Sequence, residues 1–116
     1  MSADIAIVAA SELKPGRNGI AAVDLHLLAV RELLGAWDLR DVQLDGFLAC
    51  PAGMAAGGGA DVFVHEAVID HLGLHPTFAE TINAGGSTYV VMVRRAGDAI
   101  RAGRCEAVLC VGAGTF

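Results

Sequence analysis

Residues 81–89 have the sequence Thr-Ile-Asn-Ala-Gly-Gly-Ser-Thr-Tyr, which is typical of a strand end, a tight glycine turn and a helix start. The first N–H groups of a helix have no partner inside the helix, and the positive end of the helix dipole lies beside them. Enzymes place an anion or a nucleophile at such turns. Here Gly85 and Gly86 stand where a reactive side chain could stand. In the simpler alternative, Ser87 caps the helix and the glycines only permit the turn.

Three cysteines are the other candidate nucleophiles, and no two of them form a CxxC pair. An odd number in a chain that is expected to be cytosolic favours free thiols over a disulfide framework. Cys50 ends a predicted strand, at the edge where α/β proteins bind ligands, and is a candidate functional thiol. Cys105 and Cys110 are predicted to be buried structural residues.

The histidines and the glycine-rich segments give weaker signals. His71 and His75 are four residues apart, but Gly73 and Pro76 interrupt any helix between them, so we expect no metal site there. His71 is instead expected to pack at a helix end. The chain contains neither GxGxxG after a strand nor GxxxxGK[ST], and residues 53–59 are predicted to form a flexible loop and not a phosphate cradle.

Composition restricts the class of protein. With 116 residues the chain is long enough for one domain with one core. Its net charge is −5 and no basic block occurs, which argues against a nucleic-acid partner. No apolar run reaches the roughly 18–20 residues that a bilayer span requires, and the first residues lack the positive flank of a signal peptide. A cytoplasmic location is therefore expected.

Aliphatic runs alternate with helical patterns along the chain. Strands are predicted over residues 5–9, 46–50, 77–83 and 107–111, and helices over 22–36, 61–72 and 87–102. This β-α-β-α-β-α-β order predicts a mostly parallel sheet covered on both faces, which is a three-layer α/β/α sandwich. We interpret residues 1–116 as one incomplete domain, the front part of a larger unit.

Side-chain spacing predicts the buried faces and ends of the helices. The first helix is expected to bury a stripe formed by Leu27, Val30, Leu34 and Trp37. The last is expected to bury one formed by Tyr89, Met92, Val93, Ala96 and Ile100. Asp61 is a predicted N-cap, and Gly73 and Gly103 are predicted helix stops.

The turn and its surroundings resemble the N-terminal half of the thiolase superfamily over nearly the whole chain. The resemblance rests on residues 24–31, on the acidic lead 41–47, and above all on Gly85-Gly86-Ser87 followed by a helix and residues 99–109. In true thiolases a cysteine begins this turn, and matched on Ser87 that cysteine falls at Gly85. The acyl-accepting thiol is therefore missing, because glycine has no side chain to acylate.

The resemblance implies a cysteine-less branch similar to lipid-transfer or sterol-carrier type thiolase-like proteins. It implies an acyl-CoA thioester as substrate, no further cofactor, and substrate binding by Gly85, Gly86 and Ser87, whose N–H groups at 86 and 87 would donate to the thioester oxygen. It also implies a homodimer formed through residues 77–84, and for several relatives a partner subunit with an OB-fold. The catalytic groups of the second half would lie beyond Phe116.

Three functions remain open at this point. The first is retro-aldol cleavage of a lipid or steroid acyl-CoA without a covalent acyl intermediate. The second is a non-catalytic scaffold or lipid-binding subunit of the same fold. The third, classical acetyl transfer, requires a nucleophile that Gly85 does not supply.

Overall fold

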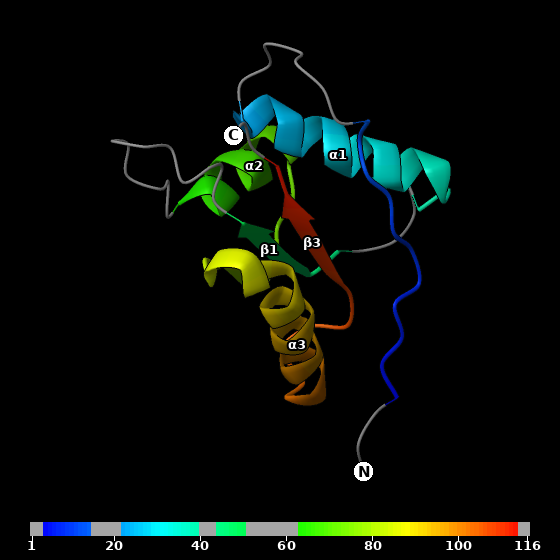
Figure 1. Cartoon of the computed structure of the whole chain (residues 1–116). Coiled ribbons are helices and arrows are strands. Elements are labelled where there is room, and N and C mark those ends of the chain that lie inside the picture. The colour runs from blue at the N-terminus through cyan, green and yellow to red at the C-terminus, as the bar shows by residue number, and fades with distance from the viewer. Residues whose placement is uncertain (1–3, 15–21, 40–43, 51–62, 114–116) are drawn as a thin grey trace.

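Three parallel strands form one sheet, in the order β2-β1-β3 (Figure 1). They are β1 (Gly46–Cys50), β2 (Phe78–Thr81) and β3 (Val108–Gly112). The central strand pairs with β2 from Gly46↔Phe78 and with β3 from Gly46↔Val108, so all three strands end at the same edge. The computed structural model describes residues 4–14, 22–39, 44–50 and 63–113.

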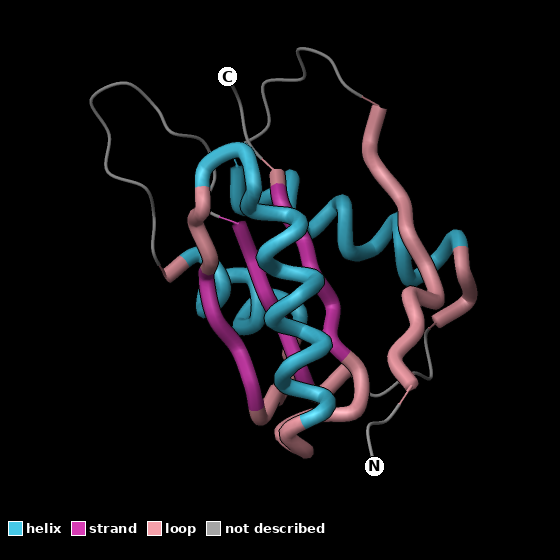
Figure 2. The backbone as a smooth tube through the Cα atoms, turned by 60° about the horizontal axis from the view of Figure 1, so that its bottom comes forward, coloured by secondary structure: helices cyan, strands magenta, loops and turns pink. Residues whose placement is uncertain are grey.

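Helices cover both faces of this sheet. The helices α1 (Ala22–Ala36) and α2 (Val64–Leu72) pack on one face, against Phe47 and Ala49 of β1. On the other face lies α3 (Thr88–Arg101), packed against Leu48, and Figure 2 shows it lying in front of the strands. Successive side chains of β1 point to opposite faces of the sheet and enter the core on each face, which explains why this strand is continuously apolar. The α/β class and the parallel sheet are confirmed.

Six of the seven predicted elements are present: α1 and β1 match their predicted ranges, and the other four have ends shifted by one to three residues. The seventh, the strand predicted over residues 5–9, is wrong, because residues 4–14 form neither strand nor helix. Ile7 and Val8 are 75% and 72% exposed, and in the described sheet no strand pairs with this apolar run. Ile5 lies beside α3 at Gly97, and the Trp37 indole donates to the Ala10 carbonyl at 3.0 Å.

The predicted helix stops are confirmed. Gly73 is left-handed at φ 66°, its N–H donates to the Asp70 carbonyl, and Gly103 follows α3 at φ 75°. The predicted cap Asp61 lies outside the described residues.

The buried stripe of α3 is rotated from the predicted one. Met92 and Ala96 are buried as expected, but Tyr89 and Val93 are 57% and 48% exposed. Ala99 completes the buried stripe in their place. Similarly, Trp37 of the predicted α1 stripe is 51% exposed, because it lies past the end of that helix.

The amino end of the sheet is closed around Asp45. Its carboxylate accepts the N–H groups of Glu106 (2.9 Å) and Ala107 (2.9 Å), which hold the segment entering β3. Its carbonyl accepts the Thr77 N–H at 2.9 Å, just before β2. The bonds from Ala107 and Glu106 lower the pKa of Asp45, and partial desolvation opposes them. One residue thereby ties together the starts of all three strands.

Among the helices that the structure describes, none is long and apolar enough to cross a bilayer.

Candidate functional site

The glycine turn lies at the carboxyl end of the sheet, between β2 and α3. Residues Gly85–Ser87 form a single 3₁₀ turn that runs directly into α3. Gly85 has φ 62°, a conformation that an L side chain rarely adopts, and open space surrounds the position of its missing Cβ. The sequence-predicted residues Gly85, Gly86 and Ser87 are therefore brought together in one turn.

Thr88 organises this turn in place of the predicted Ser87. The buried Thr88 hydroxyl accepts the Ala84 N–H at 2.9 Å and donates to the Gly85 carbonyl at 2.7 Å. Ser87 is exposed and makes no side-chain capping bond. The predicted Ser87 cap is thus wrong by one residue, because Thr88 faces back into the turn and Ser87 faces away from it.

The turn also uses several of its own backbone donors. The Gly85 N–H donates to the Asn83 side-chain oxygen at 3.2 Å, and the Ser87 N–H to the Ala84 carbonyl at 3.3 Å. The Ser87 amide, expected to face a ligand oxygen, is therefore already engaged by a long bond. A ligand that approached this end would have to displace that bond or find another donor.

Cys50 is the thiol at this end of the sheet. It is half-buried at the end of β1 and packs on the same side of the sheet as α3. Burial raises the pKa of the Cys50 thiol, and a hydrogen bond with the Thr88 side chain partly offsets the rise. The thiol is consequently protonated at neutral pH, which makes it a poor nucleophile.

His26 of α1 bonds to the Cys50 backbone, and the sequence pattern did not predict this contact. The imidazole is fully buried in α1, and its Nε2 donates to the Cys50 carbonyl at 2.9 Å. A histidine between two leucines in a helix that is apolar on its inner face was the available signal. Its bond goes to backbone, which indicates a role in fixing the end of β1.

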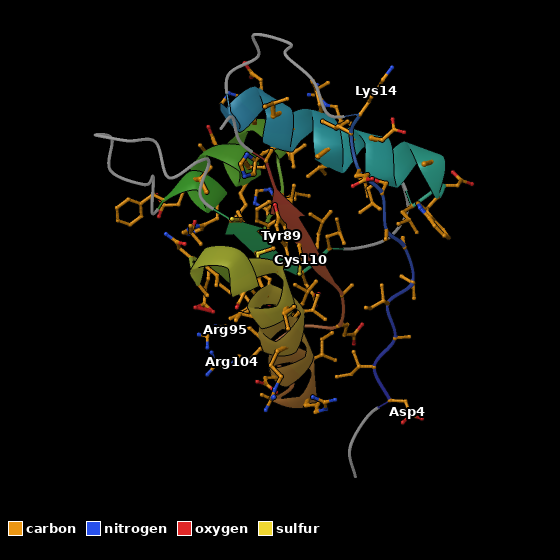
Figure 3. The ribbon with its side chains drawn as sticks, in the orientation of Figure 1. Asp4, Lys14, Tyr89, Arg95, Arg104 and Cys110 are labelled. Carbon is orange, nitrogen blue, oxygen red and sulfur yellow. The ribbon has the colours of Figure 1, made fainter. Side chains whose placement is uncertain are left out.

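Tyr89 lies over the end of β3. A Cβ built on Gly112 would fall 2.5 Å from the Tyr89 hydroxyl oxygen and 2.7 Å from Cε1, so the ring rests directly on this glycine. Figure 3 places Tyr89 between the start of α3 and the carboxyl half of β3. Burial, and to a lesser extent the charge that Cys50 would carry, raises the pKa of the Tyr89 phenol. The phenol is therefore a proton-bearing donor at neutral pH.

The two other cysteines are poor nucleophiles as well. Cys105 is buried, as predicted, and desolvation followed by the Asp45 charge raises the pKa of its thiol. Cys110 on β3 is half-buried, and burial raises its pKa to about 11. Neither thiol has the positive surroundings that activate a cysteine.

The two histidines of α2 bond to groups outside Gly85–Ser87. The His65 ring nitrogen Nδ1 is 2.6 Å from the Thr81 hydroxyl, which also accepts the His65 N–H at 3.2 Å. His71 is exposed, contrary to the packed position expected for it, and its Nδ1 bonds to the Ala67 carbonyl. An open groove of about 500 Å³ between α2 and the start of β2 includes His65 and His75 but no residue of the turn. Within the described ranges, no three potential ligands are placed to hold a metal ion.

The sequence matches no family model, and no curated protein matches it at a significant level.

Proposed function

We propose that this chain forms the nucleophile-free side of an acyl-CoA pocket in a thiolase-like unit that cleaves a carbon–carbon bond by retro-aldol chemistry. The observation that carries the proposal is the conformation of Gly85. It begins a helix-entry turn at the carboxyl end of a parallel sheet, at φ 62°, with no side chain and with open space beside it. That space suits the approach of a ligand to the backbone and excludes covalent catalysis at this position.

The state of the thiols favours a mechanism without an acyl-enzyme. Burial raises the pKa of all three cysteines, so a thiolate is scarce at neutral pH. Retro-aldol cleavage needs none. A base takes the proton from the β-hydroxyl of a β-hydroxyacyl thioester, and the Cα–Cβ bond breaks as the carbonyl product forms. The electron pair moves into the thioester as an enolate, which is then protonated at Cα to give the shortened acyl-CoA.

Two exposed apolar side chains next to the turn support a lipid or steroid acyl group as part of the ligand. Tyr89 and Val93 lie on the same side of α3, one turn apart, and both are about half exposed. An apolar acyl chain would cover them. The remaining catalytic groups belong, on this proposal, to a second thiolase-like half.

Homodimerisation through β2 is part of the same proposal. In the described sheet β2 pairs with β1 on one side only, so its outer edge offers unpaired backbone groups. A second copy, or a partner subunit with an OB-fold as in the relatives that the sequence resembles, would protect this edge.

The test uses the full-length protein with two substrates. A β-hydroxyacyl-CoA with a tertiary or secondary alcohol should be cleaved to a carbonyl compound and a shorter acyl-CoA. A β-ketoacyl-CoA supplied with free CoA should not be thiolysed. Intact mass measured during turnover should show an unmodified chain, and an acyl adduct on a cysteine would overturn the proposal. Tight binding of both thioesters without turnover would identify the non-catalytic, lipid-binding alternative instead.

A further inference from the structure

We propose that the Tyr89 phenol donates the hydrogen bond that holds the thioester carbonyl oxygen of the substrate. The inference rests on the proposed function and names the side chain that would contact the ligand there. Of the two backbone donors that the sequence suggested, Gly86 and Ser87, it takes the place of Ser87, whose N–H bonds to the Ala84 carbonyl.

The first argument is the use of donors inside the turn. The N–H groups of Ala84, Gly85 and Ser87 all bond to acceptors within residues 83–88, and the Thr88 N–H bonds to the Gly85 carbonyl. These four amides are therefore committed to the turn itself. A carbonyl oxygen arriving at this end of the sheet finds these four donors occupied and would need the Gly86 N–H or a donor from a neighbouring side chain, because an oxygen that loses its hydration needs a replacement hydrogen bond.

The second argument is the position of the phenol. Tyr89 follows the turn directly, its ring rests on Gly112, and its hydroxyl has no hydrogen-bond partner among the residues that the structure describes. The ring cannot move closer to β3, and any side chain at position 112 would push it away. Gly112 therefore sets the place of the hydroxyl oxygen without bonding to it.

The third argument concerns the protonation state and the nature of the ligand. The Cys50 thiol lies close enough to influence the titration of Tyr89, and both groups stay neutral at pH 7 because their pKa values are raised. A neutral phenol donates one hydrogen bond and carries no charge, which suits a neutral carbonyl that becomes an enolate oxygen in the reaction.

A binding cycle on the full-length protein tests the inference. It compares wild type with Tyr89→Phe, and free CoA with a stable ketone analogue of acetyl-CoA in which a methylene replaces the sulfur. We expect Tyr89→Phe to weaken the ketone analogue about tenfold and to leave the affinity for CoA unchanged, because only the analogue has the carbonyl. Turnover of the β-hydroxyacyl-CoA should fall about 100-fold in kcat. Arg94→Ala, on the exposed side of the same helix, is the matched control and should change none of these values.

A second variant keeps the phenol and moves it. In Gly112→Ala the new methyl group must displace the Tyr89 hydroxyl, so the same selective loss of the ketone analogue is expected. Equal weakening of CoA and of the ketone analogue in Tyr89→Phe would assign the residue a packing role and overturn the inference. Unchanged binding of the analogue in both variants would overturn it while leaving the proposed function standing. Failure of wild type to bind either compound would overturn both proposals.

Discussion

At the amino end of the sheet, the Asp45 carboxylate accepts two backbone N–H groups and its carbonyl accepts a third. At the carboxyl end, the Tyr89 phenol has no hydrogen-bond partner within the described residues and a glycine lies beneath its ring. The amino end therefore satisfies its polar groups internally and fixes the register of the strands. The carboxyl end has the hydroxyl of the exposed Tyr89 and open space beside Gly85, and it is the edge at which α/β proteins in general bind ligands.

Removing space at the amino end should have the largest effect. A Cβ on Gly46 would lie 2.7 Å from Val108 Cγ2, 3.0 Å from Cys105 Sγ and 3.3 Å from the Ala107 carbonyl oxygen. Gly46→Ala should lower the free energy of unfolding by about 2–3 kcal/mol, because β1 must move away from β3. Urea unfolding measures this change. Gly35→Ala is the control, since nothing lies within 4 Å of its added methyl group, and it should be neutral or stabilising.

Removing the carboxylate at the same end should have a somewhat smaller effect. Asp45→Ala leaves the N–H groups of Glu106 and Ala107 to water, and we expect a loss of about 1.5–2 kcal/mol in unfolding free energy. Glu106→Ala removes a neighbouring exposed carboxylate and should cost less than about 0.5 kcal/mol. Equal losses in the two variants would mean that general surface charge, and not the hydrogen bonds to the Asp45 carboxylate, stabilises the amino end.

Removing the Thr88 hydroxyl should lower the free energy of unfolding by less than removing the Asp45 carboxylate. Thr88→Val removes the acceptor for the Ala84 N–H and the donor to the Gly85 carbonyl, at a cost of about 1 kcal/mol. Thr88→Ser keeps the hydroxyl and should retain most of that energy. Ser87→Ala should have no measurable effect on thermal unfolding, because Ser87 makes no capping bond. A large effect at Ser87 would restore the cap that the sequence pattern predicts.

The smallest expected effect is the pH dependence of stability that the Asp45 carboxylate contributes. The folded-state pKa of Asp45 lies below its ordinary value, so the unfolded chain binds the proton more tightly than the folded chain. The contribution of Asp45 should be complete above about pH 5 and should decline below about pH 4, as the pH falls toward the folded-state pKa. Unfolding midpoints at pH 3 and pH 6 should differ less in Asp45→Asn than in wild type. An identical difference would exclude Asp45 as a source of the acid sensitivity.

The sequence predicts what depends on local pattern and misses what depends on a neighbour. Gly46–Cys50 and Ala22–Ala36 match their predicted ranges, because apolar periodicity and breakers such as Pro51 determine them locally. Residues 5–9 have the same apolar composition but no strand beside them in the described sheet. A strand is defined by pairing, and composition cannot supply the partner.

The site shows the same limit at the level of single residues. The glycine turn was recognisable from Gly85 and Gly86. Which hydroxyl bonds to the turn, that of Ser87 or that of Thr88, depends on which face of α3 is turned toward the sheet. The same orientation of α3 leaves Tyr89 outside the buried stripe. Its signal was present in the sequence as the only tyrosine of the chain, directly after the turn, and was interpreted as a core residue.

The hydrogen bond between the Trp37 indole and the Ala10 carbonyl has a spectroscopic consequence. Trp37 is the only tryptophan, it is half exposed, and it holds the N-terminal segment at the end of α1 and not at the sheet. Its emission therefore reports release of that segment, whereas the amide circular dichroism reports melting of the helices and sheet. Because a surface segment held by few contacts opens at lower cost than the core, the fluorescence transition should precede the dichroism transition in urea. Non-coincident curves in this protein would then signify a detached terminus and not a partly folded sheet.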